Sequence, residues 1–223
     1  MKRTPLSLRK LPNYSRREEQ VNMITHIVGS VLGIAALVLC VLRAASRGDG
    51  WGIVSSVVYG ISMIATFAVS SIYHGMRACY GKKVMQVVDH CMIYLLIAGT
   101  YTAVVLPAIR PHYPALAWGL FCFEWGTAAV AAMLTAIDLK KYSVFSMICY
   151  ITMGWAVIPF WRKILEVLTQ GGFWLLLGGG IAYTIGSVLY GMGSKRKWMH
   201  SVFHIFVVLG GVLQFFSILL YAI

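Results

Sequence analysis

Four polar residues with helical spacing stand out in a chain that is otherwise strongly apolar. His200 and His204 are four residues apart, so in a helix both imidazoles lie on one face and can be directed at a single ion. Ser70 and His74 have the same spacing in another apolar segment. Three neutral imidazoles with one open position form a catalytic type of zinc site. We therefore predict Zn²⁺ as the cofactor, with His74, His200 and His204 as its ligands.

Asp89 and His90 open a further apolar segment. Adjacent residues point about 100° apart on a helix, so at most one of the two is expected to face the ion. Asp89 and Ser70 are predicted to hold the metal-bound water or to orient a ligand ring, and they are the candidate catalytic residues. Zinc would bring the pKa of its bound water to about 7, which supplies a nucleophile near neutral pH.

Glu19, Asn22 and His26 follow one another by single helical turns at the start of the first apolar segment. We predict that they line the entrance to the site or brace it, and we expect the same of His90. A single histidine in a membrane segment is more often a hydrogen-bonded interfacial residue than a ligand. The convergence of such residues from four segments at one membrane face is what favours a metal site.

The composition predicts a polytopic membrane protein of the all-α class. The chain has 223 residues, of which 59% are hydrophobic and 12% charged, and its mean hydropathy is +0.77. A soluble domain of this length needs a more polar surface. The net charge of +12 is assigned to membrane topology and not to nucleic-acid binding, because basic residues between apolar segments set orientation.

Seven apolar runs are long enough to span about 30 Å of hydrocarbon as helices. A seven-transmembrane-helix bundle is therefore expected, with antiparallel neighbours joined by short loops. The runs lie at roughly 22–42, 51–74, 84–106, 114–136, 142–161, 172–193 and 198–221.

Lysine and arginine are distributed unequally between the two sets of loops. Fourteen lie in the N-terminal tail and in the loops after the second, fourth and sixth runs, whereas five lie on the other side. The positive-inside rule predicts a cytoplasmic N-terminus and an outside C-terminus, in a cell membrane of the bacterial inner-membrane type. We expect residues 1–18 to form a basic cytoplasmic tail and residues 19–223 a single membrane domain.

With these residues in these positions, the chain resembles the bacterial hemolysin III family, within the progestin and adipoQ receptor superfamily. The resemblance runs from Glu19 to the C-terminus. The residues that carry it are Glu19-x-x-Asn22-x-x-Thr25-His26, Ser70-x-x-x-His74, the stretch from Asp89 to Thr102, Met153-Gly154-Trp155 and His200-x-x-x-His204. Two positions depart from the family pattern: Gln214 replaces a frequent histidine, and Ala103 replaces a usual proline.

The resemblance implies seven helices with a cytoplasmic N-terminus and a zinc ion held by three histidines, which map to His74, His200 and His204. It also implies that Ser70 and Asp89 lie near the zinc-bound water. The superfamily is grouped with alkaline ceramidases, which hydrolyse lipid amides. Bacterial members carry a hemolysin label and have been linked to membrane-lipid or energetic homeostasis.

Several functions stay open from the sequence. The leading hypothesis is a zinc-dependent hydrolase of a lipid amide or ester, with a membrane lipid as substrate. The alternative is a non-enzymatic regulator or sensor of the lipid or energetic state of the membrane, clamped by zinc. A cytolytic pore is disfavoured because no polar lumen is visible. A transporter lacks a trail of charges, since Glu124 stands nearly alone in the outer half of its run.

Overall fold

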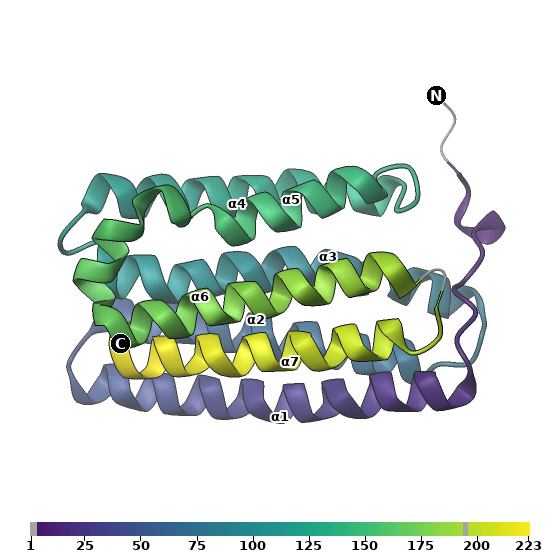
Figure 1. Cartoon of the computed structure of the whole chain (residues 1–223), viewed down its shortest axis with the longest axis horizontal. Coiled ribbons are helices and arrows are strands. Elements are labelled where there is room, and N and C mark those ends of the chain that lie inside the picture. The colour runs from purple at the N-terminus through teal and green to yellow at the C-terminus, as the bar shows by residue number, and fades with distance from the viewer. Residues whose placement is uncertain (1–3, 194–195) are drawn as a thin grey trace.

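The computed structural model describes residues 4–193 and 196–223 and is all-helical, with no β-strand in those ranges (Figure 1). The predicted all-α class is confirmed. Residues 1–3 of the predicted tail and Ser194 and Lys195 of a predicted loop lie outside the described residues. The α-helices are α1 Arg16–Ser46, α2 Gly50–Gly75, α3 Tyr80–Val104, α4 Pro114–Ile137, α5 Ser143–Trp155, α6 Trp161–Gly193 and α7 Met199–Ser217. Short π-helical turns, Val105–Ile109 and Ile218–Ala222, extend α3 and α7.

Helix α1 begins earlier than its apolar run predicts. Ser15 caps it, because the Ser15 hydroxyl accepts a hydrogen bond from the Glu18 N–H (3.3 Å) while the Glu18 carboxylate accepts one from the Ser15 N–H (2.9 Å). This reciprocal capping box satisfies two of the free N–H groups at the helix start. Residues 16–18 of the predicted tail therefore belong to the helix.

Glycines bring α1 and α2 into close contact. A Cβ atom built on Gly29 would lie 2.6 Å from the Phe67 ring, and one on Gly33 would lie 3.0 Å from the backbone nitrogen of Ile64. Small residues at such positions let helix backbones approach each other closely in a membrane. The close approach places the start of α1 against the end of α2, where Glu19 and His74 meet.

Helix α5 is shorter than the predicted run 142–161. It ends at Trp155, and a 3₁₀ turn, Ile158–Phe160, follows. Pro159 accounts for the ending, since a proline ring clashes with the carbonyl four residues earlier, here that of Trp155. Helix α6 then starts at Trp161, earlier than the predicted 172, and is broken at Thr169, whose φ of 58° is not helical.

Six stretches of the described residues are long and apolar enough to cross a membrane, because Ser143–Gly191 counts as one of them. The sequence predicted seven separate runs in the same part of the chain. Figure 1 shows successive helices running back and forth along the long axis of the bundle, with α5 and α6 antiparallel to each other. Helices α1, α3, α5 and α7 begin at the same end of the bundle, which we call the histidine end.

Candidate metal centre

Three imidazoles converge at the histidine end of the bundle. The Nε2 atom of His200 lies 3.4 Å from Nε2 of His74 and 3.0 Å from Nε2 of His204, and the possible ligand atoms of all three lie within 4.8 Å of one another. A zinc ion bound tetrahedrally at about 2.0–2.1 Å would set its nitrogen ligands about 3.3 Å apart. The two distances measured from His200 are therefore compatible with a metal ion shared by the three rings.

The three rings are buried, with exposed fractions of 3% for His74, 9% for His200 and 1% for His204. When three imidazole nitrogens face one another at these distances, hydrogen bonds between them cannot satisfy the lone pairs of all three at once. A shared cation removes this conflict. The donor set and its burial thus agree with the metal site predicted from the sequence.

The start of α7 is fixed by a contact with the start of α1. Trp198 precedes the helix in a left-handed conformation, with φ 68°. Its backbone N–H donates a hydrogen bond of 2.7 Å to the buried Glu18 carboxylate. A non-glycine residue in this region is strained, so the contact has to hold it in place. The contact sets where His200 and His204 begin their helix.

His74 is oriented by a chain of charges from two other helices. Its Nδ1 atom lies 2.6 Å from the Glu19 carboxylate of α1, and the other oxygen of that carboxylate accepts a hydrogen bond of 2.6 Å from the Lys82 amine of α3. A carboxylate at Nδ1 keeps the proton there and leaves Nε2 free to bind a metal. Asn22 Nδ2 lies 3.5 Å from the same Nδ1 atom, a long contact.

His26 lies against the predicted ligands but is not one of the three. Its ring stacks on that of His204, with the ring centres 3.8 Å apart, and contacts Phe67 edge-on. Both ring nitrogens are buried without a hydrogen-bond partner in the described part of the chain. Of the predicted support residues, Glu19 and Asn22 therefore contact His74, while His26 contacts His204.

The segment before α1 covers the site. The Tyr14 ring stacks on the His200 ring at 4.7 Å between centres. Burial raises the pKa of the Tyr14 hydroxyl above its ordinary value, and the neighbouring Tyr190 and Glu19 raise it further. The ring thus packs as a neutral cover over His200.

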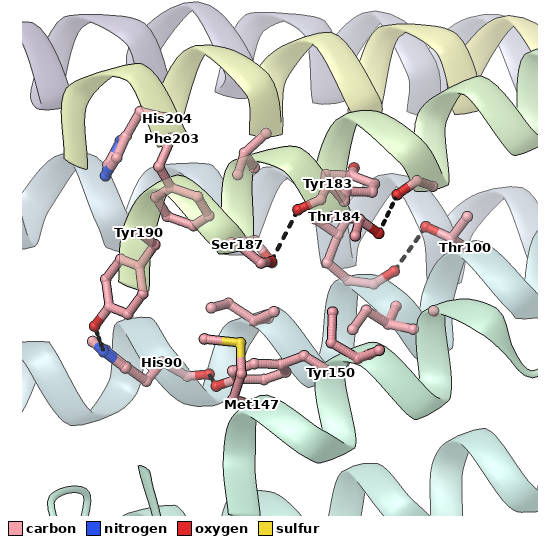
Figure 2. Close-up of a pocket in the computed structure, with 18 of the residues that line it drawn as sticks. His90, Thr100, Met147, Tyr150, Tyr183, Thr184, Ser187, Tyr190, Phe203 and His204 are labelled. Atoms are coloured by element: carbon pink, nitrogen blue, oxygen red, sulfur yellow. Dashed lines mark hydrogen bonds between the residues drawn. The ribbon is translucent and has the colours of Figure 1, made fainter. Parts of the chain in front are cut away.

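A cavity of about 140 Å³ begins at this site and extends between α2, α3, α5, α6 and α7. Ser70, Asp89 and His26 line it together with His200 and His204. Figure 2 shows His204, Tyr190 and His90 at one end of the cavity and Thr100 toward the other. Most of the lining is apolar, as in binding sites for small apolar molecules.

The predicted residues Asp89 and His90 both line this cavity, but His90 is bonded elsewhere. Its Nδ1 atom donates to the Gln86 carbonyl (2.8 Å), and its Nε2 atom lies 3.3 Å from the Tyr190 hydroxyl (Figure 2). His90 therefore braces α3 against α6. The roles of Asp89 and Ser70 toward a reacting water stay predictions.

Sequence reasoning missed Lys82 and Tyr14. Lys82 was assigned to the loops that set membrane orientation, yet it is 5% exposed and bonded to Glu19. The neighbouring Lys83 is only partly buried, and nothing in the sequence distinguished the two lysines. Tyr14 lies in a polar stretch without helical periodicity, so its position over His200 had no signal in the sequence.

Glu124 lies apart from the metal site, within α4. It is fully buried, and its two carboxyl oxygens have no hydrogen-bond partner in the described residues. It does not line the cavity that the histidines share. This placement favours a packing residue over part of a substrate passage.

Comparison with known proteins gives matches over nearly the whole chain. A family model described as "Haemolysin-III related" matches residues 14–215. The chain is 35% identical to Hemolysin-3 of Bacillus cereus over 93% of each chain. It is 33% identical to the Hemolysin-3 homolog of Bacillus subtilis over 94% of this chain and 97% of the relative. It is also 25% identical to the human Monocyte to macrophage differentiation factor, over 90% of this chain and 83% of that protein.

Proposed function

Because this chain belongs to the haemolysin-III related family, we propose that it is a zinc-dependent hydrolase of a membrane-lipid amide or ester. The family and the apolar helices make it a multi-pass integral membrane protein, consistent with a plasma-membrane location. The proposal concerns the activity that this membrane protein carries.

One observation carries the proposal: three imidazole nitrogens meet at the end of a mostly apolar cavity inside the bundle. Two of the three ligands, His200 and His204, also line that cavity. A lipid chain in the cavity would therefore place its polar linkage beside the metal. A zinc ion that only clamped the helices would not require this opening.

His74, His200 and His204 would hold the zinc ion, which supplies a water of pKa near 7 when bound. Asp89 would orient the attacking water, take up its proton at a carboxylate oxygen, and pass that proton to the amine or alcohol that leaves as the bond breaks. Ser70 would donate its hydroxyl hydrogen to the carbonyl oxygen of the lipid. The apolar wall would hold the acyl chain and exclude bulk water from the reacting bond.

The test compares the wild-type chain with a His200→Ala/His204→Ala variant, both purified in detergent. We expect about one zinc ion per wild-type chain and none in the variant, because two of three ligands are gone. The zinc-loaded chain is then offered a broad panel of lipid amides and esters. Asp89→Asn should keep its zinc and lose hydrolysis, which separates binding of the metal from use of the water. A fully zinc-loaded chain that hydrolyses no member of the panel would overturn the enzymatic proposal.

A second candidate function is a zinc-clamped regulator of membrane state. The observation that favours it is the chain of contacts from Lys82 through Glu19 to His74, which ties α1, α2 and α3 together around the site. In that case zinc should raise the thermal stability of the chain while the panel shows no hydrolysis. The cavity beside His200 and His204 makes the hydrolase the better supported of the two.

We also propose seven membrane crossings, with the N-terminus and the histidine end in the cytoplasm. The support is the excess of lysine and arginine on that side and the alternating direction of the seven helices in Figure 1. A reporter active only in the cytoplasm should work when fused in the 138–142 loop and fail when fused after Ile223. The reverse pattern would overturn this orientation.

A further inference from the structure

A second cavity adjoins the one that contains the histidines. It has a volume of about 40 Å³ and reaches toward the end of α3 and the first half of α6, among Val105, Ile164 and Phe173. Six of the described residues line both cavities, so the two cavities lie next to each other on either side of one wall. The residues of that shared wall are Thr100, Tyr101, Gly154, Trp155, Gly180 and Gln214.

Most polar side chains of the shared wall are bonded within the protein. The Thr100 hydroxyl donates to a carbonyl of its own helix (2.8 Å), and the Tyr101 hydroxyl donates to the Gly154 carbonyl (3.4 Å). The Trp155 indole N–H donates to the Thr184 hydroxyl (3.0 Å). These groups therefore need no ligand to satisfy them.

Gln214 is the exception in this wall. The structure gives its side-chain amide no hydrogen bond to any described residue, although it faces both cavities. The side chain passes directly over Gly179 of α6, where a Cβ atom would lie 2.5 Å from Gln214 Cγ. Because Gly179 has no side chain, the Gln214 side chain can occupy this space.

An unbonded amide inside a membrane protein requires a partner. A polar group without a hydrogen bond in apolar surroundings is unfavourable. A buried water needs two to four polar partners to be held, and the other polar groups of this wall are already bonded. A polar group of a molecule that occupies the first cavity, which Gln214 lines, can supply this partner.

We propose that the side-chain amide of Gln214 forms a subsite for a hydroxyl group that lies partway along the acyl chain of the ligand. This inference rests on the proposed function and narrows its substrate class to lipids with hydroxylated acyl chains. Gln214 follows His204 by ten residues of one helix, which places it about 15 Å along the axis from the metal site. The second cavity lies beside Gln214 on the side away from the histidines, and the proposal places the end of the acyl chain there.

The chemistry of the amide selects a hydroxyl over a charged group. A glutamine side chain offers two N–H donors and a carbonyl acceptor. A hydroxyl can both accept from the N–H and donate to the carbonyl. Among the residues that the structure describes, no charged side chain lines the second cavity or the shared wall, so a carboxylate or an amine at this depth would lack a counter-charge.

The experiment measures fatty-acid binding to the zinc-loaded full chain in detergent, by displacement of radiolabelled stearic acid. 12-Hydroxystearic acid carries its hydroxyl at a comparable distance from the carboxyl, and 2-hydroxystearic acid carries it beside the carboxyl. We expect about fivefold tighter binding of 12-hydroxystearic acid than of stearic acid, the value of one neutral hydrogen bond. If 2-hydroxystearic acid binds more tightly than stearic acid, that difference should not depend on Gln214.

Gln214→Met keeps the length of the side chain and removes the amide, so it should abolish the preference for 12-hydroxystearic acid over stearic acid. Gln170→Met makes the same change at an exposed position of α6 and should keep the preference. Equal binding of stearic and 12-hydroxystearic acids to the wild type would overturn the subsite and leave the proposed hydrolase standing. Failure of every fatty acid to bind would overturn both the subsite and the lipid site of the proposed function.

Discussion

The Glu19 carboxylate and the His74 imidazole form a direct contact of 2.6 Å between α1 and α2, at the histidine end of the bundle. Because Nδ1 of His74 faces the carboxylate, its Nε2 atom faces His200, 3.4 Å away. Lys82 binds the other carboxylate oxygen. The orientation of one predicted ligand thus depends on a residue from each of two neighbouring helices.

Replacing Glu19 should weaken metal binding without removing a ligand. Glu19→Gln keeps a carbonyl oxygen near His74 but loses the carboxylate that orients the ring and accepts from Nδ1, so zinc affinity should fall between about tenfold and a hundredfold. The measurement is competition with a chelator of known affinity at constant pH. Glu166→Gln, at an exposed carboxylate bonded to the Tyr113 hydroxyl, is the matched control. Unchanged zinc affinity in Glu19→Gln would show that His74 needs no carboxylate.

Removing the Lys82 amine should destabilise the fold. Lys82→Met leaves the Glu19 carboxylate without its buried cation. This should lower the free energy of unfolding by about 2–3 kcal/mol, less than for a fully buried pair because Glu19 is partly exposed. The double variant with Glu19→Gln should recover part of this loss, because the unpaired charge is then gone. Lys83→Met is the control, since the hydrogen bond from the Lys83 amine to the Ser7 carbonyl is exposed to solvent, and a change within about 0.5 kcal/mol is expected. Equal losses for the two lysine variants would contradict the assignment of Lys82.

The apolar runs and the paired histidines were visible in the sequence because helical periodicity is a local property. The observed α2 and α4 differ from their predicted runs by one residue at most at each end. Likewise, His200 and His204 needed only their spacing to be placed on one face. These are the parts of the fold and of the site that nearest neighbours in the chain determine.

Contacts between distant segments could not be predicted in this way. Trp198 and Glu18 are 180 residues apart, and Asp138 binds the Thr4 backbone across 134 residues. The sequence predicted an uninterrupted run over 142–161, and the early end of α5 depended on how strongly Pro159 would act. The polar segment before α1 packs on the bundle, although its composition is that of an ordinary polar tail.

Acid should release that N-terminal segment from the loop between α4 and α5. The Thr4 N–H donates to the Asp138 carboxylate (2.9 Å), and this bond, with help from the Lys141 N–H and Arg9, lowers the Asp138 pKa from 3.8 to about 2. A carboxylate with a lowered pKa stabilises the fold at pH values above its unfolded pKa and loses this effect as the pH falls through its folded pKa. The Tm difference between the wild type and Asp138→Asn should therefore be present at pH 6 and shrink between pH 4 and pH 2. A Tm difference that does not change over this range would contradict the role of the charge.

The close contact of α1 with α2 predicts that adding a single methyl group will affect both the fold and the site. In Gly33→Ala the new Cβ would lie 2.9 Å from Ile64 Cγ1 and 3.0 Å from the Ile64 backbone nitrogen, and backbone cannot move aside as a flexible side chain does. The helices must separate, which should lower the free energy of unfolding by about 1–3 kcal/mol and weaken zinc binding, since Glu19 and His74 lie on the separated pair. Gly119→Ala in α4 meets no atom within 4 Å and should instead be neutral or stabilise the helix by up to about 1 kcal/mol. Unfolding and chelator competition on both variants test the prediction, and equal stabilities would mean that the approach of α1 to α2 does not limit the structure.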